Sequence, residues 1–233
     1  MRFVLQRYKM RDTHYDLHIH SDCSDGAASV HEIASRANTL NLETIALADH
    51  FWPSLGSRQG GENIIMSRRR EIEIAGSEYP ALEVLDCTEV DIQSDGSLAP
   101  VAGGLGQFDL IIGSFHWASD STQWASTLSK VVKKRQFDIL GHWDGFLSSY
   151  REEDGDIAAR VLAEAGVAIE LNEKYMSEHT GFFEQAEDYD CIFTLGSDSH
   201  SLDTIGQLDN GRKMAADFSL RVVDPAYFLK QRK

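Results

Sequence analysis

Several features that would point to other classes of protein are missing from this chain of 233 residues. Its three cysteines, Cys23, Cys87 and Cys191, are widely spaced and form no Cys-x-x-Cys pair, which argues against a disulfide framework and against a zinc ribbon. No apolar run approaches the ~20 residues that span a bilayer. The N-terminal segment is too short and too interrupted by charge to be a secretory signal. We therefore expect a cytoplasmic protein without a membrane partner.

Positive charge is also scarce. The 22 lysines and arginines are outnumbered by 37 aspartates and glutamates, which gives a formal net charge of −15. Because duplex binding relies on basic side chains that neutralise phosphates, general nucleic-acid binding is not expected, although recognition of an end or of a short oligonucleotide stays open. The acidity either serves solubility or reflects carboxylates that bind metal cations, and composition alone does not choose between the two.

The length and the pattern of apolar segments predict an α/β fold. With 42% hydrophobic residues the chain can form one sizeable domain, and since no internal repeat or long linker divides it, we expect a single domain over residues 1–233. Short apolar runs rich in Ile, Leu, Val or Phe are typical of strands buried on both faces. The predicted strands cover residues 15–20, 44–49, 82–90, 108–115, 137–141, 167–171 and 191–196.

Helix signals lie between these strands. The predicted helices cover residues 30–40, 60–77, 121–135, 155–165, 182–189 and 224–233. Ser29 and Glu32 form a capping-box pattern at the first helix, Gly166 is a stop signal for the fourth, and Pro225 suits the first turn of the last. Alternating strands and helices predict βαβ units and a parallel sheet, either closed as a barrel or open and doubly wound.

Polar residues gather at the predicted carboxyl ends of the strands, where parallel barrels build their active sites. Six of the nine histidines lie there: His18, His20, His50, His116, His142 and His200. Glu89 and Asp198 lie at two of these ends, and alternation along a strand puts His18 and His20 on one side. Imidazole and carboxylate together suit zinc, manganese or iron. The pattern therefore predicts a site for more than one divalent metal, able to bind a phosphoryl oxygen and activate a water.

The order of these residues resembles the polymerase-and-histidinol-phosphatase, or PHP, family. The matching segments are Asp16-Leu17-His18-Ile19-His20-Ser21, Ser24-Asp25-Gly26, Ala48-Asp49-His50, Glu89, His116, His142 and Gly196-Ser197-Asp198-Ser199-His200. They run in order from residue 16 to residue 200 and so cover most of the chain. The resemblance implies a distorted (β/α)7 TIM-like barrel of seven βα units that holds three divalent metals.

Carried over position by position, the resemblance implies three metal positions. The first would take His18, His20, Glu89 and Asp198, the second Glu89, His116 and His142, and the third Asp25, His50 and His200. Glu89 would bridge two metals, and the residues of the first set would act in catalysis through the metals. The chain departs from the family at two places: Gly26 stands where other members have a histidine, and Ala48 stands where the second motif usually has threonine.

The remaining polar residues near these positions are expected to support the site or to contact substrate. Asp16 would orient a ligand imidazole, and Asp49, facing the other side of its strand, would give structural support. Glu170 and Asn172, at the end of the sixth strand, suit either role equally.

Basic residues near the predicted site are candidate phosphate ligands. Three of them follow predicted strand ends, namely Arg58, Lys174 and Arg212, and solvated surface charge is an equal alternative for each. The triplet Arg68-Arg69-Arg70 lies in a predicted helix and is expected to form a solvated face.

The expected activity is hydrolysis of a phosphomonoester by a metal-activated hydroxide. The substrate would be a small phosphorylated metabolite such as histidinol phosphate or a nucleotide. Alternatives are a phosphodiesterase acting on short oligonucleotides and a non-catalytic metal-binding or regulatory module, against which the intact ligand set argues. A related amidohydrolase would typically use a carbamylated lysine at a central strand end, and none is found at the equivalent places. The oligomeric state stays open.

Overall fold

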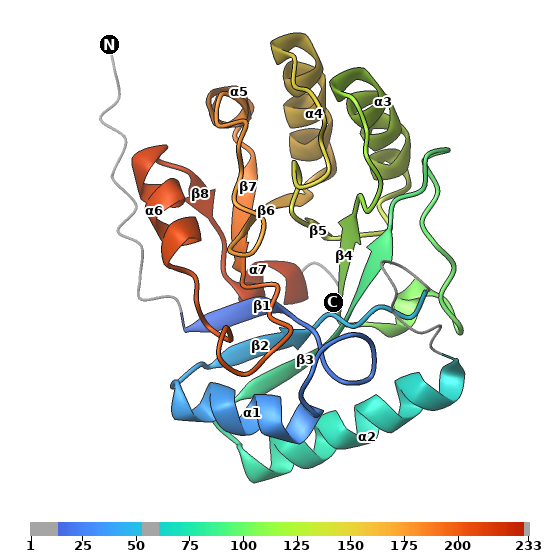
Figure 1. The fold of residues 1–233 in the computed structure, drawn as a ribbon, viewed down its shortest axis with the longest axis vertical. Helices are drawn as coiled ribbons and strands as arrows, with labels where there is room; N and C mark the ends of the chain where they lie inside the picture. Colours follow the sequence, from blue (N-terminus) through green and yellow to red (C-terminus); the bar gives the residue numbers. More distant parts are fainter. Residues whose placement is uncertain (1–13, 53–60, 231–233) are drawn as a thin grey trace.

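The computed structural model describes residues 14–52 and 61–230, and within them eight parallel strands alternate with helices (Figure 1). The strands lie side by side in chain order. They are β1 (Tyr15–Ile19), β2 (Thr44–Leu47), β3 (Glu83–Asp91), β4 (Leu110–Ser114), β5 (Ile139–Leu140), β6 (Ala168–Asn172), β7 (Ile192–Gly196) and β8 (Arg221–Val222). The helices are α1 (Val30–Thr39), α2 (Glu62–Glu78), α3 (Ser121–Val131), α4 (Glu152–Ala165), α5 (Phe182–Asp188), α6 (Asp209–Asp217) and α7 (Pro225–Leu229), with short 3-10 turns at Leu105–Gln107 and Val132–Lys134.

The sheet curls until its first strand meets the segment that follows β7. Ile19 and Ser199 form a parallel bridge, the His20 amide donates to the Ser199 carbonyl at 2.8 Å, and the Ser199 amide donates to the His18 carbonyl at 3.2 Å. The short β8 pairs instead with the amino-terminal half of β7, at Ile192 and Phe193. The predicted distorted TIM-like barrel is confirmed, with one strand more than the seven expected.

Helices α1 to α6 cover the outer face of the sheet (Figure 1). Helices α1 and α2 run along β1, β2 and β3, whereas α3, α4 and α5 stand beside the later strands. The predicted capping box is present, because the Ser29 side chain accepts from the Glu32 amide and the Glu32 carboxylate accepts from the Ser29 amide. Gly166 ends α4 with φ at 69°, as expected of a left-handed helix stop.

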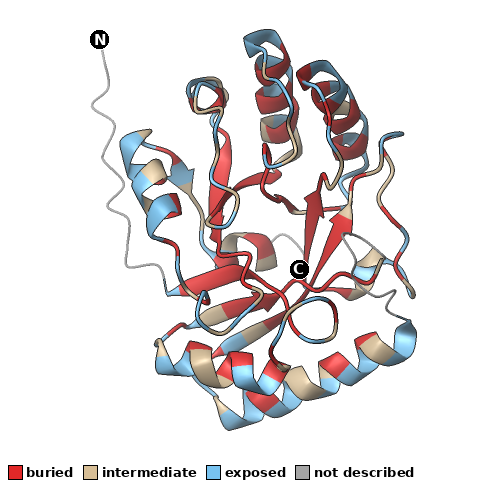
Figure 2. Cartoon of the chain, in the orientation of Figure 1, coloured by how far each residue is buried: buried red, intermediate tan, exposed pale blue. Residues whose placement is uncertain are grey.

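Burial follows the strands (Figure 2). Every residue of β1, β4, β6 and β7 is buried, as the unbroken apolar runs predict for a sheet covered on both sides. A separate cluster fills the space between the first strands and their helices, where Ile33 and Ile45 are fully buried. Each such side chain contributes about 1.5–3 kcal/mol relative to an exposed position.

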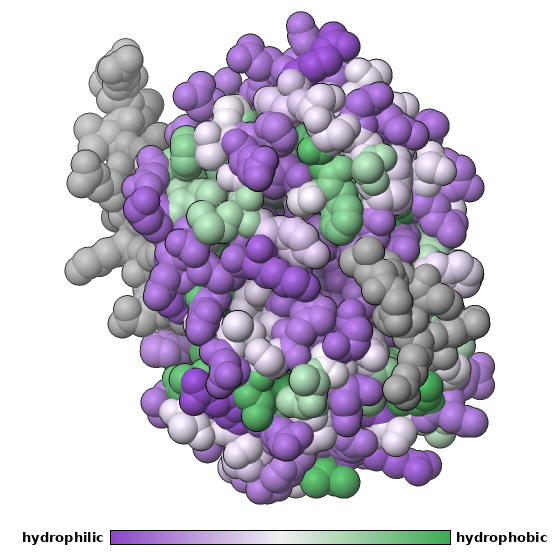
Figure 3. Space-filling view, viewed as in Figure 1, coloured by the Kyte–Doolittle hydropathy of each residue, from purple (hydrophilic) through white to green (hydrophobic). Residues whose placement is uncertain are grey.

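The exterior is mainly polar. The face in Figure 3 is dominated by hydrophilic residues, as expected for a chain with 25% charged residues. Among the residues described, no helix combines the length and apolar character needed to cross a membrane.

The expectation of a solvated face at residues 68–70 is wrong for Arg69, which pairs with Asp86 and donates to Gln107 at 3.0 Å, and more clearly for Arg68. Its side chain is fully buried and donates to the carboxylate of Asp49 at 2.8 Å and to the Leu47 carbonyl at 3.0 Å. Its other terminal nitrogen pairs with Asp86 and donates to the Cys87 carbonyl at 2.7 Å. Arg68 therefore neutralises carboxylates of two neighbouring strand segments, a role that a helical pattern alone does not reveal.

Asp49 in turn binds the loop after β1 through hydrogen bonds. Its carboxylate accepts from the Ser21 amide and from the Ser24 hydroxyl, both at 2.7 Å. Burial alone would raise the pKa of Asp49, but Arg68 outweighs it and holds the pKa below its ordinary value. The expected structural role of Asp49 is thus seen in its contacts, and the loop it holds carries Asp25.

Candidate metal centre

All nine candidate ligands lie at or just beyond the carboxyl ends of strands, which is where the sequence placed them. His18 lies on β1 and Glu89 on β3, and the other seven lie in the segments that follow β1, β2, β4, β5 and β7. Seven of them are almost closed to solvent, and only Asp25 and His200 keep about a quarter of the side chain open, at 25% and 29%. The barrel therefore brings residues that are up to 182 positions apart in sequence (18 and 200) to one end of the sheet.

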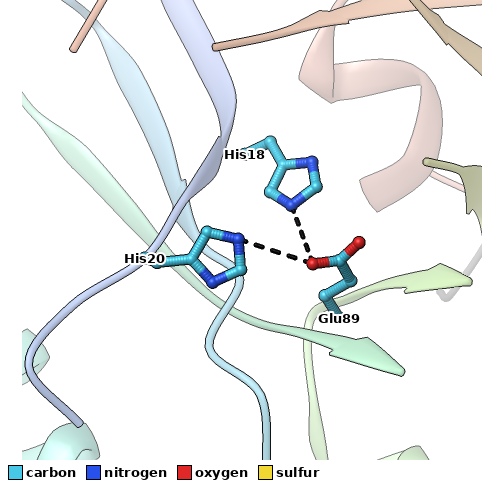
Figure 4. A group of neighbouring side chains, drawn as sticks. All are labelled: His18, His20 and Glu89. Carbon is cyan, nitrogen blue, oxygen red and sulfur yellow. Dashed lines mark hydrogen bonds and ion pairs between the residues drawn. The ribbon is translucent and has the colours of Figure 1, made fainter. Parts of the chain in front are cut away.

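Glu89 lies at the centre of this group, and Figure 4 shows it with His18 and His20. Its Oε2 faces the Nε2 atoms of three imidazoles, His18 at 3.2 Å, His20 at 3.4 Å and His50 at 3.3 Å. Its Oε1 faces two more, His142 at 3.0 Å and His116 at 3.4 Å. Burial alone would raise the pKa of Glu89, but the surrounding histidines outweigh it and hold the pKa well below its usual range. The carboxylate is thus ionised and has an oxygen for each of two neighbouring cations.

Two further carboxylates complete the cluster. Asp198 Oδ1 lies 3.4 Å from His20 Nε2 and 4.0 Å from His18 Nε2. Asp25 lies 3.4 Å from His200 Nε2 and 3.5 Å from His20 Nδ1. The pKa values of both carboxyl groups are lowered, because nearby histidines outweigh the effect of burial.

The structure groups the ligands in part differently from the arrangement that the resemblance implies. Three sets have ligand atoms within 4.8 Å of one another: His18 with His20 and Glu89, His20 with Asp25 and His200, and His50 with Glu89 and His116. His50 lies closer to Glu89, at 3.3 Å, than to Asp25, at 4.0 Å. His20 faces Asp25 with one ring nitrogen and Glu89 with the other.

These spacings fit bound cations better than direct hydrogen bonds. Among the described side chains, both ring nitrogens of His20 and the Nδ1 of His142 are buried without a hydrogen-bond partner. The separations of about 3.4 Å match those of two atoms that each bind a metal at about 2.1 Å in tetrahedral geometry. Buried imidazoles without partners are costly unless something else occupies them. The residues present therefore fit divalent metals with nitrogen and oxygen ligands.

Two of the ligand segments have unusual backbone conformations. Asp198 and His142 have φ angles of 53° and 24°, in the left-handed region that non-glycine residues seldom adopt. The Nδ1 of His200 donates to the Asp198 carbonyl at 2.9 Å, which supports the first of these turns. Such conformations cost about 1–3 kcal/mol and persist where the surrounding structure enforces them, often at functional sites.

Carboxylates behind the cluster were only partly anticipated. Asp91, which is not among the predicted site residues, accepts from His116 Nδ1 at 2.8 Å; it follows Glu89 by two positions on β3 and so faces the same side, which is the signal that could have revealed it. Burial alone would lower the pKa of His116, but Glu89 and Asp91 together raise it to about 10. By contrast, burial lowers the pKa of His50 to about 4.

The role expected of Asp16 is wrong in one respect. Its carboxylate accepts from backbone amides, at 3.0 Å from Ser197, 3.3 Å from His18 and 2.9 Å from Gly206, where an imidazole had been expected. Asp16 thus fastens the β7 end to β1. Glu170, left open before, contacts His18 Nδ1 directly at 2.7 Å.

The three candidate phosphate ligands have different surroundings. Lys174 Nζ lies 3.6 Å from Asp198 Oδ1 and 3.4 Å from His200 Nδ1, with 43% of the side chain exposed. Arg212, on α6, donates to Asp209 at 3.2 Å. Arg58 lies outside the described residues.

Aromatic side chains border one side of the cluster. The Phe146 ring lies 5.6 Å from the ring of His116 and 5.7 Å from that of His142, and Tyr175 lies 4.9 Å from His142. Both rings are only partly buried. They form an apolar border beside the imidazoles, whereas Lys174 gives the cluster a charged border.

Histidines and carboxylates that converge on the carboxyl ends of parallel barrel strands define the class: a metal-dependent hydrolase. A family model, the PHP domain, matches residues 16–174, and the chain therefore belongs to the PHP domain family of metal-dependent phosphoesterases. The family expected from the motifs is confirmed.

One known protein aligns with most of the chain. The chain is 24% identical over 203 residues to the DNA polymerase/3'-5' exonuclease PolX of Bacillus subtilis (strain 168), an alignment that covers 84% of this chain and 36% of that protein. It therefore spans about a third of that relative's length.

Two solved structures share the fold. A histidinol phosphate phosphatase from Lactococcus lactis, complexed with zinc, L-histidinol and phosphate, has a TM-score of 0.66 at 15% identity and covers 90% of this chain and 95% of its own. A putative histidinol phosphatase from Listeria monocytogenes has a TM-score of 0.61 at 14% identity, with 83% and 97% covered. At these identities the likeness concerns the fold.

Proposed function

We propose that the protein hydrolyses a small phosphomonoester with a cluster of up to three divalent metals. The observation that carries the proposal is the position of Glu89, a single ionised carboxylate facing five imidazoles with its two oxygens. The zinc, L-histidinol and phosphate bound to the Lactococcus protein of the same fold support a small phosphorylated substrate. The nitrogen-rich ligand set suits zinc, manganese or iron.

The chain's own residues would divide the work. Metals would supply Lewis acidity toward a phosphoryl oxygen and toward the attacking water. Glu89, with Asp198 and Asp25, offsets the cationic charge and fixes the ligand histidines. Lys174, beside Asp198 and partly open to solvent, is placed to offset charge on the phosphate oxygens. Phe146 and Tyr175 would face the alcohol part of the ester and shield it from water.

A second candidate activity is cleavage of phosphodiesters at the end of a short oligonucleotide. The aligned relative from Bacillus subtilis, which is named as a polymerase and exonuclease, is the observation in its favour. Against a long nucleic-acid ligand stands the formal charge of −15, because phosphate-backbone contacts require basic side chains.

One experiment tests both. The purified protein is analysed for metals and assayed on p-nitrophenyl phosphate, bis-p-nitrophenyl phosphate, histidinol phosphate and nucleoside monophosphates. We expect two to three metals per chain and faster hydrolysis of monoesters than of the diester. Addition of a chelator should abolish this activity. An Asp198→Asn variant should lose turnover, whereas His31→Gln, a change at an exposed residue paired with Glu78, should keep it. A protein that stays inert after addition of zinc, manganese and iron would contradict the proposal, and a preference for the diester would favour the second activity.

A further inference from the structure

We propose that Glu170, which belongs to none of the three expected ligand sets, positions one metal ligand in each of two sets. The inference rests on the proposed function, since it concerns metals held at His18 and at His142. Glu170 lies on β6, is 1% exposed, and accepts from three donors. These donors are His18 Nδ1 at 2.7 Å, the His142 amide at 2.9 Å and the Asn172 side-chain amide at 2.9 Å.

The contact with His18 fixes the tautomer of the imidazole. A carboxylate only accepts, so His18 carries a proton on Nδ1, and when a metal is bound its Nε2 is left to supply the lone pair. That Nε2 is the atom that lies 3.2 Å from Glu89 and 4.0 Å from Asp198. An outer carboxylate that orients a ligand histidine in this way also increases its basicity toward a metal.

The contact with His142 fixes a backbone conformation. The second oxygen of Glu170 accepts from the amide of this residue, whose φ of 24° is unusual for a side chain of its size. With the backbone held so, His142 Nε2 reaches to 3.0 Å from Glu89 and 3.2 Å from His116 Nε2. One carboxylate on β6 thereby orients two ligands, His18 on β1 and His142 in the segment after β5.

The backbone leaves space for this carboxylate. A Cβ atom at Gly196 would lie 2.0 Å from Glu170 Oε1 and 2.7 Å from the Cβ of His18. Gly196 ends β7 without a positive φ, so lack of room, and not backbone conformation, requires glycine there. Gly196 thus allows the Glu170 carboxylate to lie directly beside the ligand His18.

A Gln side chain at position 170 tests the inference, because it has the same shape and only one acceptor oxygen. If that oxygen faces His18, the NH2 group of the new side chain faces two other donors, the His142 N–H and the Asn172 NH2, and no hydrogen bond can form there. Asn172 has no freedom to flip, since its Oδ1 already accepts from the amides of Lys174 at 3.0 Å and Tyr175 at 2.8 Å. If the amide is reversed, its NH2 faces His18 Nδ1, which must then accept, and the proton moves to the Nε2 that a metal needs.

The experiment is a zinc titration of metal-free protein by calorimetry, on the wild type and on Glu170→Gln, Glu170→Asp and Asp91→Asn. Asp91→Asn is the matched control, because it makes the same chemical change behind His116 alone. We expect Glu170→Gln to weaken zinc binding about 10- to 100-fold at two positions, and Asp91→Asn to do so at one. Glu170→Asp keeps both acceptor oxygens on a shorter side chain, so it should cause a smaller loss of zinc affinity. It also keeps the inference testable if the Gln variant does not fold.

Long-range proton–nitrogen NMR of the zinc-loaded proteins gives a readout that a merely structural role would not change. His18 should carry its proton on Nδ1 in the wild type, and this signal should be lost or shifted in Glu170→Gln while the His116 signals stay. Zinc affinities in Glu170→Gln and Glu170→Asp equal to those of the wild type would overturn the inference and leave the proposed function intact. A wild-type protein that binds no zinc, manganese or iron would overturn both.

Discussion

The guanidinium of Arg68 donates to the carboxylate of Asp49 at 2.8 Å, and both side chains are closed off from solvent. Asp49 in turn holds the loop that carries Asp25. A helix on the outside of the barrel is thereby connected to the metal-binding face through buried charges, so changes far from the cluster can disturb it.

Replacing Arg68 by Met should destabilise the fold by about 3–5 kcal/mol, because the buried carboxylate of Asp49 loses its cation, whereas Asp86 keeps Arg69. Urea unfolding followed by circular dichroism measures this difference. Arg70→Met, on the same helix but exposed, is the matched control and should stay within about 0.5 kcal/mol of the wild type. Equal stability of the two variants would mean that the buried pairs contribute nothing net.

The stability difference between wild type and Arg68→Met should shrink in acid. The folded-state pKa of Asp49 is depressed, so its contribution is complete above the unfolded pKa of about 3.9 and is lost as the pH falls through the lower folded value. Urea midpoints measured with EDTA from pH 7 to pH 3 report this directly. A difference that grows toward low pH would have the wrong sign for this mechanism.

Gly196→Ala should remove zinc binding and turnover, because the added methyl group displaces Glu170 and presses on His18. The control is Gly76→Ala in α2, where an added Cβ meets no atom within 4 Å. That change should leave activity as it is and raise stability by about 0.5–1 kcal/mol. Elemental analysis and turnover on p-nitrophenyl phosphate compare the two, and an active Gly196→Ala protein would contradict the packing argument.

Lys174→Gln should lower kcat/KM for phosphomonoesters by about 10-fold, less than a buried donor would cause because the side chain is partly exposed. Zinc stoichiometry should not change. Lys213→Gln, at an exposed lysine paired with Asp217 on α6, provides the control and should behave as the wild type. An unchanged kcat/KM in Lys174→Gln would assign the lysine to the solvated surface.

Much of this architecture could be predicted from local sequence. The capping box at Ser29 and the stop at Gly166 are local signals that tertiary contacts do not override. The apolar strands are likewise predicted by local sequence. The convergence of Glu89 with the histidines follows from the rule that parallel strands end at one face of the barrel. The helix α6 was missed because its sequence, DNGRKMAAD, is largely polar, and β8 has only two residues.

What could not be predicted depends on partners distant in sequence. Helical spacing places Arg68 on the buried face of α2 with Ile65 and Ala75, but it does not show that the side chain meets Asp49 and Asp86, which are distant in sequence. The contacts of Glu170 likewise come from β1 and from the β5 end. A single sequence lists such carboxylates but does not show which imidazole each one meets.

The bridge between Ile19 and Ser199 has a consequence for biosynthesis. The cluster needs residues from β1 and from the segment after β7, so a ribosome-bound chain that ends before residue 198 lacks Asp198 and His200 and the strand closure that aligns them. Contacts of such long sequence separation form late and slow folding. Of the three ligand sets, the one formed by His20, Asp25 and His200 is therefore completed only together with the closure of the barrel.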